Sequence, residues 1–307
     1  MALCFVATAG EVKPAPGYQH YLVGNPADVV RPTSGLWVLQ GGGDDVDENY
    51  VRMGAHGGGG DFVVLRASQA GEYNQYIYDL CKCDSVETIV FDDRVAASDP
   101  YVIQTIRNAE ALFIAGGDQD RYVRFWRGTP VQDAINFVAA KPAPIGGTSA
   151  GMAVLGEFVY SAMYESLTSA VALADPYAHD VTLERGFLSL PRLTGILTDQ
   201  HLQERDRIGR TVTLLARLMQ DDWSSQPRAI AADRETALHI DPKNGTAEVF
   251  ATATHPTPFV YFLRPTQPPE RCEPGQPLTF RDVEVYRIGP GGRFDLAAWQ
   301  GSGGISY

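Results

Sequence analysis

The chain has 307 residues, of which 44% are hydrophobic and 20% charged, an ordinary composition for a globular protein with a sizeable core. Its formal net charge of −12 argues against binding to nucleic acid, which needs clustered lysine and arginine. The four cysteines show neither a disulfide framework nor a zinc-binding spacing, and no apolar run approaches the roughly 18 residues of a membrane helix. We therefore expect no nucleic acid, membrane, metal or cofactor among its partners.

The first 34 residues are rich in proline, which predicts an extended N-terminal arm at 1–34. Short apolar runs that end in small or polar residues follow, as is typical of buried parallel strands that lead into loops. These runs are 35–43, 61–68, 86–92, 111–118 and 143–147. Helical spacing lies between them, at 74–81, 99–110 and 129–140. Asp99 and Thr129 are the expected N-caps, because a proline follows each of them.

This alternation of strands and helices predicts an α/β fold with a parallel sheet and helices on both of its faces. Ligands of such sheets bind at the carboxyl ends of the strands. We therefore expect the glycine-rich strand ends at 41–43, 116–117 and 146–147 to converge on one site. From about residue 245 the sequence becomes β-rich. Residues 35–307 are expected to form a single domain, in which 245–307 extends or flanks the sheet.

Residues 147–151, Gly-Thr-Ser-Ala-Gly, match the G-x-S-x-G pattern of a nucleophile elbow. Glycine on either side leaves room for a strained turn that raises the Ser149 hydroxyl into a cleft. The helix expected from Ala150 directs its first N–H groups at the same place, so that the amides of Ala150 and Gly117 could stabilise an oxyanion. Short glycine patterns also recur by chance, and a purely structural tight turn is an equal alternative.

A nucleophilic serine needs a base, and His201 is the strongest candidate among the six histidines. It directly follows an apolar run that is typical of a strand and precedes a helix, which again places it at the carboxyl end of a strand. The alternative is a surface histidine that caps the helix.

Three motifs together resemble the cyanophycinase family of serine peptidases: FIAGGDQ at 113–119, GGTSAGMAVLG at 146–156 and TDQHLQERDRIGR at 198–210. Dipeptidases that cut after aspartate are related to this family. The resemblance extends from about residue 35 to about residue 240. It implies a parallel-sheet sandwich similar to class I glutamine amidotransferases and a homodimer. It also implies the release of β-Asp-Arg dipeptides from cyanophycin, a polymer of aspartate that carries arginine on its side chains.

The resemblance makes Ser149 the nucleophile and His201 its base. It also implies a substrate pocket in which arginines bind aspartyl carboxylates and acidic groups bind the substrate guanidinium. The residues at the pocket positions are Gln119, Asp199, Gln200, Arg205, Arg207 and Arg210. Spacing alone would instead favour a solvated helix face that carries Glu204, Asp206 and these arginines.

The acid of the triad is where the sequence departs from the family, whose glutamate lies in a Gly-Ile-Asp-Glu-x-Thr segment. Aligned on Thr236, this position holds Arg234, between Asp233 and Glu235. A basic residue cannot orient the base, so we expect Glu235 to do so, with Asp233 as the alternative. If this segment is a strand, Asp233 and Glu235 share one face and Arg234 faces away from the histidine.

The sequence therefore predicts a serine exopeptidase that hydrolyses peptide or isopeptide bonds at aspartyl residues. An esterase-like serine hydrolase is one alternative, although ordinary α/β-hydrolases have the acid before the histidine in the chain. A catalytically inactive binding homologue, which lost its acid at Arg234, is the other. The sequence is compatible with the cytoplasm and with secretion in a processed form.

Overall fold

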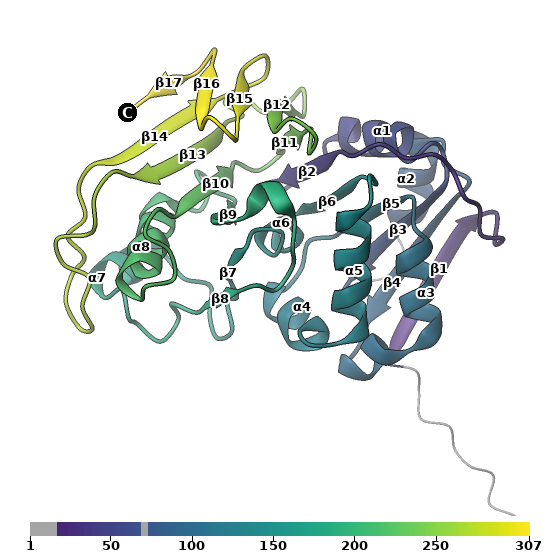
Figure 1. Cartoon of the computed structure of the whole chain (residues 1–307), viewed down its shortest axis with the longest axis horizontal. Helices are drawn as coiled ribbons and strands as arrows, with labels where there is room; N and C mark the ends of the chain where they lie inside the picture. The colour runs from purple at the N-terminus through teal and green to yellow at the C-terminus, as the bar shows by residue number, and fades with distance from the viewer. Residues whose placement is uncertain (1–16, 69–72) are drawn as a thin grey trace, which may run out of the picture.

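The computed structural model describes residues 17–68 and 73–307, which fold into two β-sheets with helices packed against them (Figure 1). Residues 1–16 of the predicted arm lie outside the described residues. The rest of the arm is partly built into the domain, because Tyr18–Gly24 form strand β1, which pairs antiparallel with β4 at the edge of the first sheet.

The first sheet has ten strands in the order β1-β4-β3-β5-β6-β2-β11-β12-β15-β16. Beyond β1, their bounds along the sheet are Ser85–Phe91 (β4), Asp61–Arg66 (β3), Ala111–Ile114 (β5), Ile145–Thr148 (β6), Trp37–Gln40 (β2), Thr236–Ile240 (β11), Thr246–Ala251 (β12), Arg293–Asp295 (β15) and Gln300–Ser302 (β16). The five strands from β4 to β2 run parallel, as the alternating pattern predicted, and β11 joins β2 antiparallel. The carboxyl ends of the parallel strands therefore share one edge.

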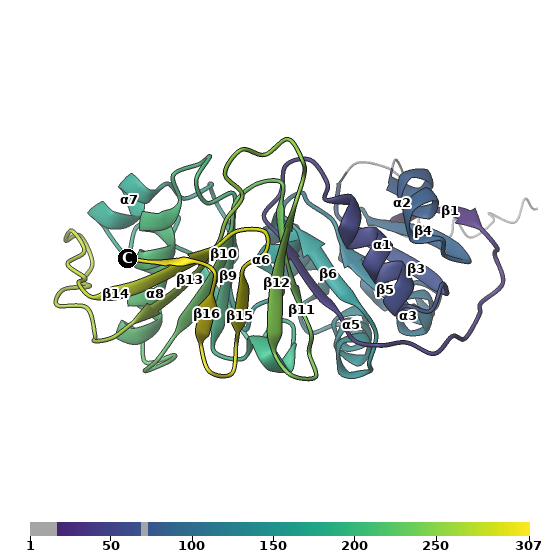
Figure 2. The ribbon, with the colours of Figure 1, turned by 90° about the horizontal axis from the view of Figure 1, so that it is seen from above.

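Helices cover both faces of this sheet, as Figure 2 shows from above. Helices α1 (Asp47–His56) and α2 (Tyr73–Cys81) pack on one face, and α3 (Pro100–Asn108) and α5 (Pro130–Ala140) pack on the other. Helix α4 (Gln119–Trp126) and the 3₁₀ turns η1 (Arg94–Ser98) and η2 (Pro191–Leu193) complete this part. Each helix buries an apolar stripe against the strands, which explains the helical spacing in the sequence.

The two predicted helix caps differ in the structure. Asp99 caps α3, because its carboxylate accepts from the amides of Tyr101 and Val102. Thr129 precedes α5 as expected, but its hydroxyl donates to the carbonyl oxygen of Trp126 (2.6 Å) and does not cap the helix.

The second sheet has seven strands in the order β17-β14-β13-β10-β9-β7-β8. Their bounds are Ile305–Ser306 (β17), Val283–Ile288 (β14), Val260–Pro265 (β13), Arg228–Ala232 (β10), Ile196–Gln200 (β9), Phe158–Tyr160 (β7) and Leu183–Arg185 (β8). Helices α7 (Ser169–Ala174) and α8 (Ile208–Gln220) pack on its outer face. The short helix α6 (Ala150–Ala153) lies between the two sheets (Figure 1).

A continuous apolar core joins the sheets. It includes Leu39 and Leu238 of the first sheet and Ile230 and Phe262 of the second. The β-rich C-terminal residues, which we expected to extend or flank the sheet, divide between the two sheets. Strands β12, β15 and β16 join the first, and β13, β14 and β17 join the second. Pairing partners far apart in the chain decide this division, so local pattern does not reveal it.

Two further features bear on the sequence-based expectations. Cys81 and Cys83 form a disulfide, although we expected no disulfide framework, and Cys272 is buried and free. In the part of the chain that the structure describes, no helix combines the length and the apolar character needed to cross a membrane.

Candidate active site

Ser149 lies in a strained turn between β6 and α6, with φ 51° and ψ −116°. A side chain on Gly147 would come within 2.5 Å of the backbone of Gly151, and one on Gly151 would collide with the carbonyl oxygen of Ile114. Glycine on either side of the serine is therefore a steric requirement of the turn. Such φ values cost a residue other than glycine about 1–3 kcal/mol and concentrate at functional sites. The elbow expected from G-x-S-x-G is thus formed, and its serine stays partly exposed.

His201 follows β9 of the second sheet and also has a positive φ, 51°. Its Nε2 lies 2.9 Å from Oγ of Ser149. Its backbone amide donates to the carbonyl oxygen of Gly41 in the first sheet (2.9 Å). The serine and the histidine therefore meet at the junction of the two sheets, at the carboxyl ends of β6 and β9.

Glu204 lies on the other side of the imidazole, where its Oε1 contacts Nδ1 of His201. Both residues belong to a turn between β9 and α8, which is closed by a hydrogen bond from the Arg205 amide to the His201 carbonyl oxygen (3.3 Å). The Glu204 carboxylate accepts a hydrogen bond from Nδ1–H, so that the lone pair of Nε2 faces the serine hydroxyl. Burial lowers the pKa of His201, while the charge of Glu204 acts in the opposite direction. The net lowering of the pKa keeps the imidazole neutral at pH 7, as a general base requires.

Glu235, the acid expected from the sequence, does not occupy this place. Its carboxylate accepts from the hydroxyl of Thr252 (3.3 Å) and lies 3.4 Å from Nε of Arg234. The segment 233–235 is a turn that carries the chain from β10 to β11, and Glu235 has a φ of 56°. The alternation of a strand therefore does not apply, and the expected position of Glu235 beside the histidine is corrected.

Asp233, the alternative acid, anchors the turn that carries the histidine. Its side chain is 2% exposed and accepts from the amides of Gln203 (3.1 Å) and Phe259 (3.3 Å). Burial raises the pKa of Asp233 to about 6, against the lowering effect of the two amide hydrogen bonds. The carboxyl group thus holds Gln203 in place, next in the chain to Glu204.

The glycine-rich strand ends converge on the site, as the sequence predicted. A side chain on Gly42, whose φ is 99°, would collide with the His201 ring. A side chain on Gly116 would lie 3.5 Å from Cβ of Ser149, and the next residue, Gly117, has a φ of 146°. The backbone therefore approaches the two reactive side chains closely from both flanks.

The buried side chain of Gln40 holds the loop of Gly41–Gly43. Its Nε2 donates to the carbonyl oxygen of Asp44 (3.1 Å), and its backbone carbonyl accepts from the Ser149 amide (3.0 Å). Gln40 and Gly42 are parts of the site that the sequence analysis did not single out.

Two of the residues expected in the substrate pocket bind each other instead. Arg210 is fully buried and forms a two-pronged ion pair with Asp199, whose Oδ2 lies 3.2 Å from Nε of the arginine. Asp199 also accepts from the hydroxyl of Thr211 (2.7 Å). A ligand cannot reach either charge in this arrangement, so their expected place in the pocket is corrected: the pair supports the wall of the site.

The other four expected pocket residues differ in accessibility. Arg207 donates to Oε1 of Gln200 (2.6 Å) and to the hydroxyl of Ser166 (3.1 Å). Burial lowers the pKa of Arg207 to about 10, so that it stays charged at neutral pH. Gln119 is buried at the start of α4 and donates to the carbonyl oxygen of Tyr160 (3.3 Å), whereas the Arg205 side chain is 52% exposed beside Glu204.

Among residues 17–68 and 73–307, no three His, Cys, Asp or Glu side chains lie close enough together to hold a metal ion.

Comparisons with known proteins agree with the resemblance carried by the three sequence motifs. Residues 67–174 match peptidase family S51. The chain is 24% identical over 225 residues to a cyanophycinase of Trichormus variabilis, across 72% of this chain and 68% of that protein. It is 23% identical over 284 residues to a cyanophycinase of Geminocystis herdmanii, across 89% and 97% of the two proteins.

A solved structure of a peptidase from an acI-B1 Actinobacterium has a similar fold. It superimposes with a TM-score of 0.57 at 15% identity and covers 86% of this chain and 98% of its own. The arrangement of the two sheets is therefore shared with a peptidase of known structure, while the expected similarity to glutamine amidotransferases stays a prediction.

Proposed function

Since the chain is a cyanophycinase-like member of peptidase family S51, we propose that it is a serine peptidase that hydrolyses peptide or isopeptide bonds at aspartyl residues. The proposed product is a β-Asp-Arg dipeptide, in line with the names of its curated relatives. The observation that carries the proposal is the contact chain from Ser149 Oγ through the His201 imidazole to Glu204.

In the proposed acylation step, Nε2 of His201 takes the proton of Ser149 as Oγ attacks the carbonyl carbon of the scissile bond. The imidazolium that forms is stabilised by Glu204, and it then returns the proton to the departing nitrogen. Water, deprotonated by the same imidazole, attacks the acyl-enzyme and releases the acid product and Ser149. Glu204 replaces Glu235 as the proposed third member of the triad.

The oxyanion of each tetrahedral intermediate needs hydrogen-bond donors close to Ser149. We assign this role to the amides of Ala150 and Gly117. Ala150 is the first residue of α6, and the amides of a first helical turn have no partner within the helix. Gly117 follows Gly116, which lies next to the serine, and its positive φ turns the backbone after β5.

Substrate recognition is assigned to Gln119, Gln200, Arg205 and Arg207. Arg207 is held by Gln200 and Ser166, so its guanidinium plane is fixed before a ligand arrives. A fixed guanidinium favours bidentate binding of an aspartyl carboxylate. Arg205 is exposed beside Glu204, where it could bind a second carboxylate.

The test is hydrolysis of cyanophycin and of a β-aspartyl dipeptide library, with products identified by mass spectrometry. We expect β-Asp-Arg from the wild-type protein. Ser149→Ala should lose on the order of 10⁴-fold or more in turnover while it keeps its melting temperature. Unchanged hydrolysis by the folded Ser149→Ala protein would rule out the assigned nucleophile.

The alternatives predict different outcomes in the same set of assays. An esterase would hydrolyse activated esters at Ser149 but none of the aspartyl peptides. An inactive binding homologue would resist labelling by a serine-directed fluorophosphonate. The contact of His201 with Glu204 favours activity, since the base has a carboxylate partner although Arg234 stands at the family's acid position.

A further inference from the structure

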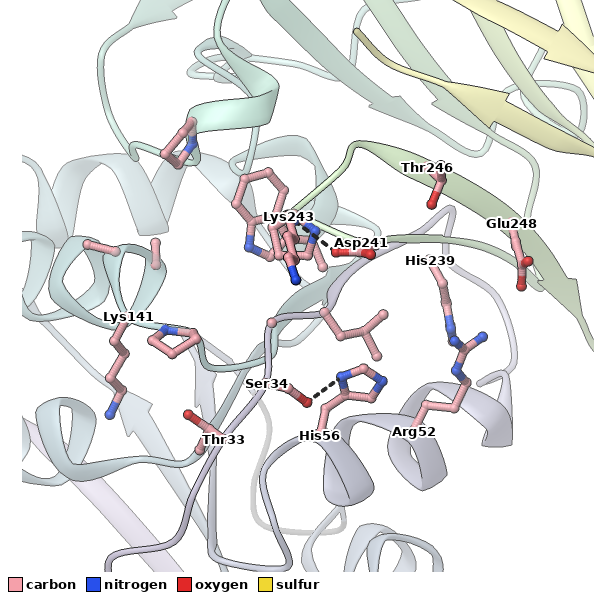
Figure 3. Close-up of a pocket in the computed structure, with 18 residues that line it drawn as sticks. Thr33, Ser34, Arg52, His56, Lys141, His239, Asp241, Lys243, Thr246 and Glu248 are labelled. Atoms are coloured by element: carbon pink, nitrogen blue, oxygen red, sulfur yellow. Dashed lines mark hydrogen bonds between the residues drawn. The ribbon is translucent and has the colours of Figure 1, made fainter.

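A groove with a volume of 810 Å³ lies at the other end of strand β2 from Ser149 (Figure 3). Trp37 at the start of β2 lines it, whereas Gln40 at the end of β2 bonds the serine amide. Three residues of a strand span roughly 10 Å, so the groove is separate from the proposed active site. Its volume falls within the range of about 300–1,000 Å³ that is typical of small-molecule sites.

Cationic side chains line the groove, and in the described part of the chain two of them form no ion pair. Within the described residues, the side chains of Arg52 and Lys243 take part in no ion pair, although the chain as a whole is strongly acidic. Arg52 lies over the ring of Phe250, 4.8 Å from its centre. Figure 3 shows Lys243 across the groove from Ser34 and His56. Two cations that line one groove are suited to a carboxylate.

The same groove also offers acceptors for a positively charged group. Asp241 lies beside Lys243 and uses one carboxylate oxygen to accept the backbone amide of that lysine (2.8 Å). Glu248 also lines the groove, although it pairs with Arg293 on its outer side (2.8 Å). Acidic and basic side chains thus line the same groove, which fits a ligand that carries both charges.

His239 supplies an independent observation. It lines the groove, is 3% exposed, and its Nδ1 has no hydrogen-bond partner in the described residues. Its Nε2 must donate to Oδ1 of Asn49 (2.7 Å), because that oxygen can only accept. Burial lowers the pKa of His239 to about 3, so the ring is neutral and Nδ1 carries a lone pair. A buried acceptor without a donor is costly, so His239 adds an unsatisfied polar atom to the wall of the groove.

From this combination we propose that the groove is a second binding site, for a zwitterionic ligand that carries an ammonium and a carboxylate group. Free amino acids and short peptides share this chemistry. The carboxylate binds Arg52 and Lys243, and the ammonium group binds the other carboxylate oxygen of Asp241. The proposal does not depend on the proposed peptidase reaction.

The test is calorimetric titration of the full-length Ser149→Ala protein with L-aspartate, L-arginine and β-aspartyl-arginine. Aspartate analogues with an acetylated amine or an amidated α-carboxylate remove one charge each. We expect each analogue to bind about 10-fold more weakly than its parent. Whether free amino acids or the dipeptide bind more tightly distinguishes the two sources of the ligand.

Variants locate the binding. Lys243→Met should weaken binding of aspartate about 10-fold but have little further effect on the amidated analogue, because both changes remove the same contact. Asp241→Asn should show the same relation to the acetylated analogue. Lys82→Met changes an exposed lysine outside the groove and should leave the dissociation constant unchanged.

A second readout uses protein labelled with ¹⁵N at histidine. Aspartate should shift the signals of His239 and His56 in the wild-type protein, but not in Lys243→Met. The proposal is overturned if no probe binds, if the Lys243 and Asp241 variants bind normally, or if only the His201 signal shifts. The last result would place the ligand at Ser149. Neither the calorimetry nor the histidine signals depend on hydrolysis, so a failure of this proposal can be distinguished from a failure of the proposed function.

Discussion

Replacing Glu204 by Gln tests the assignment of the triad acid, because it removes the charge that faces the His201 imidazole while it keeps the shape of the side chain. Two unit charges about 4 Å apart attract by about 4 kcal/mol at an effective dielectric constant of about 20. The Glu204 side chain is 27% exposed, so water screens part of this attraction. We therefore expect a loss of about 2.7–4 kcal/mol of transition-state stabilisation, or about 10²- to 10³-fold in rate.

The change should also alter the pH dependence. Glu204 raises the pKa of His201 by its charge and its hydrogen bond, against the lowering by burial. Without that charge the pKa falls further, so the neutral base persists to lower pH. The acidic limb of the pH–rate profile should therefore move to lower pH in Glu204→Gln.

The assay is the rate at which a serine-directed fluorophosphonate labels Ser149, followed from pH 4 to pH 9 at roughly unit steps, because this reaction needs the activated serine but no known substrate. Glu235→Gln is the matched control and should label at the wild-type rate with an unchanged profile. The reasoning is refuted if Glu235→Gln is the slow variant and Glu204→Gln labels normally.

Two other changes test the surroundings of the histidine. Gly42→Ala should reduce the labelling rate by on the order of 10²-fold, because a Cβ at this position would displace the His201 ring. The strained φ costs alanine only about 1–3 kcal/mol of folding free energy, so the variant should still fold. A folded variant with a normal labelling rate would contradict the placement of Gly42. Asp233 has a raised pKa, so the folded state binds the proton more tightly than the unfolded state does. Its contribution to stability is therefore present below pH 4 and lost as the pH rises to about 6, a change of about 3 kcal/mol. Asp233→Asn should remove this part of the pH dependence of the free energy of unfolding, measured by urea titration between pH 4 and 7. If the free energy of unfolding of the two proteins changed in parallel with pH, the raised pKa of Asp233 would be contradicted.

The sequence carried enough information for the serine, the histidine and the strands that present them. The glycines around Ser149 are imposed by close backbone contacts, so they appear in the sequence as a local pattern. His201 directly follows an apolar strand, which is also a local signal. The five parallel strands of the first sheet, from β4 to β2, were predictable for the same reason, because each is a short apolar run next to helical spacing.

The acid was not predictable in this way. Spacing alone favoured a solvated helix face for Glu204, yet α8 begins only at Ile208 and the preceding residues form a turn. The only sequence feature that could have indicated Glu204 is its position three residues after the histidine, within a turn. Glu235 was favoured because alignment on Thr236 places it one residue from the family's acid position. The chain changes sheets there, and no local pattern records which sheet a strand will join. The buried pairing of Asp199 with Arg210 likewise depends on tertiary packing.

The base and the acid partner of the proposed triad lie in the same short turn, within three residues of each other. Only two stretches of chain, the elbow and this turn, must therefore be placed next to each other to assemble the three side chains. The contact between His201 and Glu204 closes a very short loop, so its cost in conformational entropy is small. A sliding motion of one sheet against the other would change the separation of Ser149 and His201 but carry the histidine and its carboxylate along together. The distance between Ser149 and His201 therefore depends on how the two sheets pack, whereas the contact of His201 with Glu204 depends only on the turn that holds both residues.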